Sequence, residues 1–153
     1  MMKKKNYGKT NRNKGNNYER ELAITFRNMG HSYCKTSRQA SRLYDDSGFD
    51  LWGLPYLIQA KCGYEKSRIK PDVLFRKMNE NLIKNFPPNS LEHGYIKAVF
   101  NKINGYKSEN HLVTFEYKDI IKILAKFHKY ENLLSAEELT KVEENINNTF
   151  NGK

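Results

Sequence analysis

Helical and strand-like hydrophobic patterns alternate along this chain, and their order restricts its fold more than any other feature. Between Gly15 and Met29, apolar residues recur at spacings of three and four, the period of an amphipathic helix. Gly30 follows as the expected helix C-cap. Further helical segments are separated by short apolar or alternating runs, which are typical of strands. This order predicts a single α/β domain, with helices packed on a sheet.

The same two periods predict the elements that follow. These are strands at 32–36, 49–53 and 56–62, a helix at 71–86, strands at 95–100 and 111–115, and a helix at 118–130. The polar stretch 37–48 is expected to be a loop. Asn104-Gly105 favours a hairpin between the last two strands. A peripheral helix is expected at 135–148, where Ser135 opens a capping-box pattern.

Charge divides the chain into three expected parts. Residues 1–14 are basic without any acidic residue and are expected to be a flexible arm. Residues 15–130 are the expected folded domain, and residues 131–153 an acidic helical extension. The net charge is +10, but the first 130 residues contain 25 basic and 12 acidic groups, a net +13. Such an excess is typical of proteins that bind a polyanion, although solubility alone also explains many lysine-rich surfaces.

A cytoplasmic protein that binds nucleic acid is the expectation from these features. The apolar runs are far shorter than a membrane span, so no membrane partner is expected. The two cysteines, Cys34 and Cys62, lack the spacing of a zinc site and are expected to be reduced thiols.

Four polar side chains are predicted to converge on one patch of the sheet. Glu19 lies on the apolar face of the first helix, where a carboxylate is costly unless it is neutralised. Gln59 and Lys61 are two residues apart in an apolar strand and therefore share a face. Asp50 lies in the preceding strand, and a turn centred on residues 54–55 would place it opposite Gln59, with a one-residue slip left open.

Each of these residues also has an ordinary structural interpretation. Glu19 could pair with a local arginine, and a polar pair on a strand could face solvent on an exposed side of the sheet. The combination is more specific than any member, because it places two carboxylates, an amide and an ammonium group in one region.

The order and spacing of these residues resemble the signature of the PD-(D/E)XK nucleases. The segment from Lys14 to Leu22, KGNNYEREL, followed by Gly30, is also similar to the opening helix of the archaeal-type Holliday-junction resolvases. The resemblance spans residues 14–127. It implies a restriction-endonuclease-like core, in which a central mixed β-sheet is flanked by helices in the order αβββαβ.

The resemblance implies that Glu19, Asp50, Gln59 and Lys61 are catalytic. Asp50, the Gln59 side-chain oxygen and the Ala60 carbonyl would bind Mg²⁺, with Mn²⁺ as a substitute, and Glu19 would hold a water of the ion or a second ion. Lys61 would orient or help to deprotonate the attacking water. The expected activity is hydrolysis of phosphodiesters in DNA recombination or replication, on four-way junctions, by a symmetric homodimer.

Five basic residues flank this site and are candidates for contacts with DNA phosphates: Lys14, Arg20, Lys35, Arg38 and Arg42. Two alternatives stay open. One is another endonuclease on the same fold, which cuts duplex or branched DNA in transposition or defence. The other is a DNA-binding module without catalysis, because Gln59 stands where the family has a second acid and removes one negative charge from the metal site.

Overall fold

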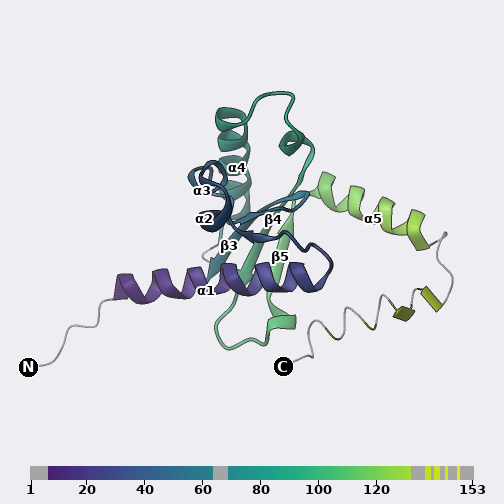
Figure 1. The fold of residues 1–153 in the computed structure, drawn as a ribbon, viewed down its shortest axis with the longest axis horizontal. Helices are drawn as coiled ribbons and strands as arrows, with labels where there is room; N and C mark the ends of the chain where they lie inside the picture. Colours follow the sequence, from purple (N-terminus) through teal and green to yellow (C-terminus); the bar gives the residue numbers. More distant parts are fainter. Residues whose placement is uncertain are drawn as a thin grey trace, which may run out of the picture.

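The computed structural model describes residues 7–63 and 69–131, together with residues 137, 138, 140, 141, 144 and 148. In chain order its elements are α1 (Tyr7–Asn28), β1 (Lys35–Thr36), α2 (Ser37–Ala40), α3 (Arg42–Asp46), β2 (Leu51–Trp52), β3 (Tyr56–Cys62), α4 (Pro71–Asn85), the 3₁₀ turn η2 (Leu91–Gly94), β4 (Ile96–Lys102), the 3₁₀ turn η3 (Ser108–Asn110), β5 (Leu112–Phe115) and α5 (Tyr117–Glu131). The fold is α/β, with a three-stranded mixed sheet flanked by helices (Figure 1).

The sheet has the strand order β3-β4-β5. β3 and β4 are parallel and are connected through α4, whereas β4 and β5 are antiparallel. β1 and β2 form a separate antiparallel pair beside the outer edge of β3. The parallel register places Leu57 beside Lys97, Gln59 beside Val99, and Lys61 beside Asn101.

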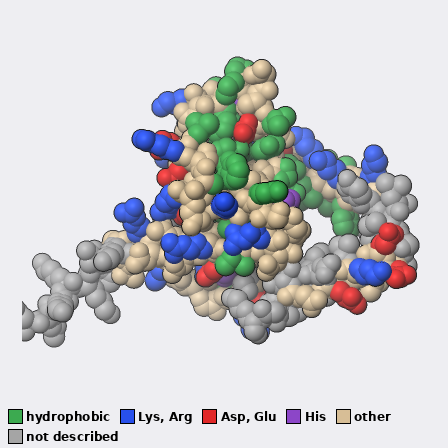
Figure 2. Space-filling model, viewed as in Figure 1, with side chains coloured by type: hydrophobic (Ala, Val, Ile, Leu, Met, Phe, Trp, Pro, Cys, Tyr) green, Lys and Arg blue, Asp and Glu red, His purple; other side chains and the backbone are tan. Residues whose placement is uncertain are grey.

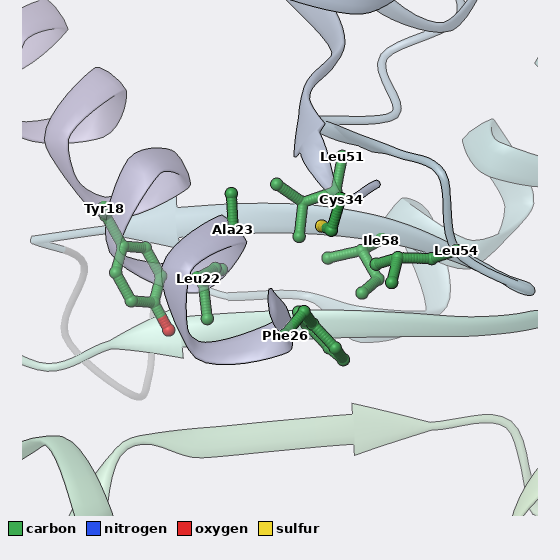
Figure 3. Packing of buried hydrophobic residues seen from close by; sticks show 8 residues of the cluster. All are labelled: Tyr18, Leu22, Ala23, Phe26, Cys34, Leu51, Leu54 and Ile58. Atoms are coloured by element: carbon green, nitrogen blue, oxygen red, sulfur yellow. The ribbon is translucent and has the colours of Figure 1, made fainter. Parts of the chain in front are cut away.

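α1 packs on one face of the sheet. Its apolar residues form a cluster with side chains from the β1–β2 pair and from β3 (Figure 3): Tyr18, Leu22, Ala23, Phe26, Cys34, Leu51, Leu54 and Ile58. Ala60 and Cys62 lie against the same cluster. Burial of each large apolar side chain contributes about 1.5–3 kcal/mol, so the α1 face fixes this helix firmly on β3.

α4 packs on the opposite face of the sheet. Leu57 and Val99 meet Phe75, Met78 and Leu82 there, and this cluster extends to Tyr44 and Phe49. Since successive residues of a strand point to opposite faces, Gln59 and Lys61 belong to the α4 face, together with Leu57. α5 extends away from the sheet (Figure 1).

The sequence predicted β3 to the residue and α4 to within one residue, but it placed the start of α1 wrongly. α1 begins at Tyr7, so residues 7–14 are helical rather than a flexible arm. These residues have no apolar stripe and therefore show no helical period in the sequence. Their lysine, arginine and asparagine side chains nevertheless do not prevent a helix from extending.

The predicted loop at 37–48 was also wrong, because it folds into the two short helices α2 and α3. Ser41 is extended and separates them, and its hydroxyl accepts a hydrogen bond from the backbone N–H of Tyr44 at 3.4 Å. Helices of four and five residues are too short to show a period in the sequence. The predicted helix at 135–148 lies largely outside the described residues.

Two tight connections shape the site's surroundings. Gly53 has φ +82°, and a Cβ there would lie 2.8 Å from the Tyr33 carbonyl oxygen, so only glycine lets β1 and β2 approach so closely. The antiparallel pairing of β4 and β5 confirms the predicted hairpin, and its connection contains Gly105 at φ +81° and also η3. Within the described ranges, no helix has the length and apolar character needed to cross a membrane.

Candidate active site

The carboxylate of Asp50 lies at the outer edge of β3. The Asp50 backbone N–H donates to the Ile58 carbonyl at 2.8 Å, and the Ala60 N–H donates to Asp50 Oδ2 at 2.7 Å. The N–H and C=O of one strand residue point to the same side, so the Ala60 carbonyl is directed to this edge as well. Asp50 therefore meets β3 around Gln59, with the one-residue slip that the sequence left open.

Asp50 lies there because the chain crosses at this residue from the α4 face of the sheet to the α1 face. Phe49 is buried in the α4 cluster, whereas Leu51 is buried in the α1 cluster. Ser37 fixes the crossing: its N–H donates to the Asp50 carbonyl at 3.0 Å, and its hydroxyl donates to the Phe49 carbonyl. Between two anchored apolar residues, Asp50 has little freedom to leave the sheet edge.

Glu19 is buried on α1, with 8% of its surface exposed. Both of its carboxylate oxygens accept hydrogen bonds from Arg38 Nη2, at 2.8 and 3.0 Å. Arg38 also lies 3.8 Å from Asp45 Oδ1. Arg38 was predicted to contact DNA phosphates, but in this structure it neutralises Glu19. This pairing with a local arginine was the ordinary interpretation weighed for Glu19.

Glu19 lies close enough to Asp50 for the Asp50 charge to make the ionisation of Glu19 harder. Burial and then the Asp50 charge raise the pKa of Glu19 to about 7, against the opposing effect of Arg38. Burial also raises the pKa of Asp50, although the Ala60 N–H, Lys61 and Arg38 oppose the increase. Two carboxylates with raised pKa values in one region indicate a site where additional positive charge would be stabilised.

Gln59 brings an unsatisfied oxygen to the same strand. Its Oε1 is buried and has no hydrogen-bond partner among the described residues, and its Nε2 donates to the Gly48 carbonyl over 3.5 Å. The turn at Gly48 is held from α4, because Asn81 Nδ2 donates to the Ser47 carbonyl at 2.9 Å and Asn85 Nδ2 donates to the Ser47 hydroxyl at 2.8 Å. These asparagines were not predicted from the sequence, although their four-residue spacing places them on one face of a helix.

Lys61 completes the set at the carboxyl end of β3. Its charge opposes the increase in the pKa of Asp50. Together with Ala60 and Cys62 it lines a pocket of about 440 Å³, whose other wall is the α1 segment containing Lys14 and Gly15. Of the predicted DNA-binding residues, Lys14 is therefore brought directly beside the candidate catalytic strand.

The other predicted DNA-binding residues are exposed. Arg20 donates to Asn17 Oδ1 at 3.1 Å, and Arg42 forms an i,i+4 ion pair with Asp46 at 3.3 Å. Lys35 is exposed on β1. Lysine and arginine side chains stand out along α1 and beside α2 and α3 on the face shown in Figure 2. These short-range surface pairs are weak and leave the cations accessible to a polyanion.

The oxygen donors at this site suit a hard cation. They are the Asp50 carboxylate, the unpartnered Gln59 oxygen and the Ala60 carbonyl, and Mg²⁺ prefers such oxygen ligands. Across the described ranges, no group of three or more His, Cys, Asp or Glu residues could hold a metal ion. A site here would therefore depend on amide and main-chain oxygens, and Glu19 would join it only after leaving Arg38.

Comparisons of the chain with protein-family models, with curated proteins and with solved structures found no match. The interpretation of the site therefore depends on its own geometry. That geometry brings Glu19, Asp50, Gln59 and Lys61 to one edge of β3, from a helix and two neighbouring strand segments. Two acids, an oxygen donor and an ammonium group can together bind a divalent cation and act on a phosphodiester.

Proposed function

We propose that this protein is a metal-dependent DNA endonuclease of the PD-(D/E)XK type. The observation that carries the proposal is the position of Asp50, whose carboxylate accepts a hydrogen bond from the Ala60 main-chain N–H at the edge of β3. Lys61 lies near enough to Asp50 to lower the pKa of Asp50, and Asp50 lies near enough to Glu19 to raise the pKa of Glu19. The restriction-endonuclease-like core is part of the same proposal.

Three oxygen atoms would hold Mg²⁺: one from the Asp50 carboxylate, Oε1 of Gln59, and the Ala60 carbonyl. When bound, the ion supplies positive charge for the developing charge on phosphate and increases the acidity of a water. The free Oδ1 of Asp50 fits this role, because within the described part of the chain only Oδ2 accepts a hydrogen bond.

Lys61 would act on the attacking water and on the phosphate. Its ammonium group donates hydrogen bonds, which orient the water and offset the negative charge of the transition state. Glu19 would accept a hydrogen bond from water near the reacting phosphate. In that state Arg38 exchanges Glu19 for a DNA phosphate, which its 37% exposed side chain can reach from the surface.

The proposed substrate is branched DNA, with the four-way junction as the first candidate. Exposed cations along α1, among them Lys14, which lines the same pocket as Lys61, offer a path for a phosphate backbone. A homodimer would place two such sites on two strands. Ile121, Leu124 and Phe127 form an exposed apolar face on α5 that a second copy could cover.

A cleavage assay tests the proposal. A labelled four-way junction and a matched linear duplex are incubated with the wild type, Lys61→Ala and Asp50→Asn, in Mg²⁺ or in chelator. We expect symmetric paired nicks in the junction, only with Mg²⁺ and only with the wild type. Glu80→Gln and Lys84→Ala, which change exposed groups on α4, should cut normally. Equal cleavage by wild type and Asp50→Asn would remove the proposal.

A second candidate is a DNA-binding module without catalysis. Arg38 occupies both oxygens of Glu19, and Gln59 supplies no negative charge, so the site is neutralised to a large extent without a metal. This candidate predicts DNA binding that divalent ions and Asp50→Asn leave unchanged, with no cleavage of any substrate. Cleavage of the duplex as readily as the junction would instead favour another endonuclease of the same fold.

A further inference from the structure

Asn101 of β4 is the neighbour of Lys61 across the sheet. The parallel register pairs the two residues directly, and strand neighbours lie about 4.8 Å apart with their side chains on one face. That face is the α4 side, since Val99, two residues before Asn101, packs in the α4 cluster. Lys61 therefore stands between Asp50 on the outer edge and Asn101 on the inner strand.

The side chain of Asn101 is buried without a partner for its oxygen. Only 4% of the residue is exposed, and Oδ1 makes no hydrogen bond to any residue that the structure describes. Asparagine is disfavoured in strands, and a buried acceptor without a partner destabilises the folded state. An apolar residue would suit this position better unless the oxygen has a task.

Lys61 is the complementary group. Its ammonium nitrogen carries three donors, and within the described residues it makes no hydrogen bond or ion pair. Its side chain is long enough to reach a cross-strand neighbour. A buried acceptor and an unused donor are thus adjacent on one face of the sheet.

We propose that Asn101 is a positioning residue for Lys61. When the Lys61 side chain turns toward β4 from its present conformation, in which the two groups are not hydrogen-bonded, Asn101 Oδ1 accepts a hydrogen bond from Lys61 Nζ and holds the ammonium group away from the Asp50 carboxylate. Without this contact the two opposite charges would close into an ion pair, and Lys61 would not reach water or phosphate. The catalytic consequence rests on the proposed function, whereas the contact itself does not.

Two substitutions of nearly the same shape separate this role from simple packing. Asn101→Leu removes the acceptor, and Asn101→Asp keeps it. We expect Asn101→Leu to lower the kcat for DNA cleavage at least about tenfold with KM within about twofold, because an interaction used in the transition state is lost. Asn101→Asp should retain most of the activity. Asn89→Leu, at an exposed position, is the matched control.

A second readout needs no activity. In protein labelled with ¹⁵N-lysine, the Lys61 ammonium signal is assigned by its loss in Lys61→Arg. A hydrogen-bonded ammonium exchanges its protons slowly with water, so we expect a protected signal in the wild type and in Asn101→Asp. In Asn101→Leu and not in Asn89→Leu, we expect exchange to become at least about tenfold faster.

The outcomes separate the two proposals. If Asn101 only fills space, Asn101→Leu removes an unsatisfied acceptor, raises the Tm, and changes neither kcat nor the ammonium signal. That result overturns the positioning role. If the wild type cuts no DNA but the Lys61 signal is protected in an Asn101-dependent way, the nuclease proposal fails and the contact is supported. If the wild type cuts DNA but the Lys61 signal is not protected, the nuclease proposal is supported and the contact with Asn101 fails.

Discussion

The two halves of β3 differ sharply, although they belong to one continuous strand. Leu57 and Ile58 are almost completely buried between α1 and α4, where apolar side chains meet on both faces. In the second half, Gln59 and Lys61 carry polar groups that lack hydrogen-bond partners among the described residues or have only a long contact, beside a carboxylate with a raised pKa. The first half contributes to the stability of the fold. The second half holds polar groups whose interactions become more favourable only when positive charge is bound beside them.

The largest difference between the halves should be seen in activity. Lys61→Ala should lower the rate of DNA cleavage about a thousandfold, equal to about 4 kcal/mol, because a donor to the transition state is removed. The Tm should change little, since Lys61 is partly exposed and has no direct partner within the described part of the chain. Single-turnover cleavage and thermal unfolding measure the two effects. A large loss of stability with a normal rate would reverse the comparison.

The apolar half should respond in stability instead. Leu57→Ala should reduce the free energy of unfolding by about 3 kcal/mol, because it leaves a cavity between β3 and α4. Urea unfolding measures this change. Ile83→Ala, at an exposed position of α4, should have almost no effect. Similar losses for both variants would mean that the α4 face is not the core described above.

Glu19 should make stability depend on pH. Since the folded-state pKa is about 7 and the ordinary value is 4.5, the contribution of protonated Glu19 is complete below pH 4.5 and is lost as the pH rises through about 7. The loss should be on the order of 2–3 kcal/mol. Urea unfolding of the wild type at pH 5 and pH 8 should show it, and Glu19→Gln should lack it. Glu80→Gln, at an exposed position, serves as the control.

The smallest effects are expected at Gln59, where one substitution should affect stability and cation binding differently. Gln59→Met conserves volume and removes a buried unpartnered oxygen, so it should leave the free energy of unfolding unchanged or increase it by about 1 kcal/mol. Ca²⁺, a hard cation that takes oxygen ligands as Mg²⁺ does, serves as the probe of the proposed ion site. The same substitution should abolish stabilisation by Ca²⁺, which is about 1.4 kcal/mol at ten times the Kd in the wild type. Thermal unfolding with and without Ca²⁺ tests both. An equal Ca²⁺ effect in the two proteins would place the ion elsewhere.

Local sequence signals were sufficient where proline or glycine residues marked the ends of an apolar segment with a clear period. β3 was predicted to the residue because an apolar run lies between Pro55 and Gly63, and α4 because Pro71 and Pro87 mark its ends. The positions of Glu19 on an apolar helix face and of Gln59 and Lys61 on one strand face follow from periods of 3.6 and 2. These residues, and the α/β class, were therefore available from the sequence.

Contacts between distant segments were decided only by tertiary packing. The pairing of Glu19 with Arg38 requires α2, which shows no period, to be placed beside α1. The seat of Asp50 on the Ala60 N–H depends on a one-residue register, and the neighbourhood of Lys61 and Asn101 depends on the parallel alignment across α4. Periodicity specifies which face of an element a side chain occupies, but only the packed core fixes how far one element slides along another.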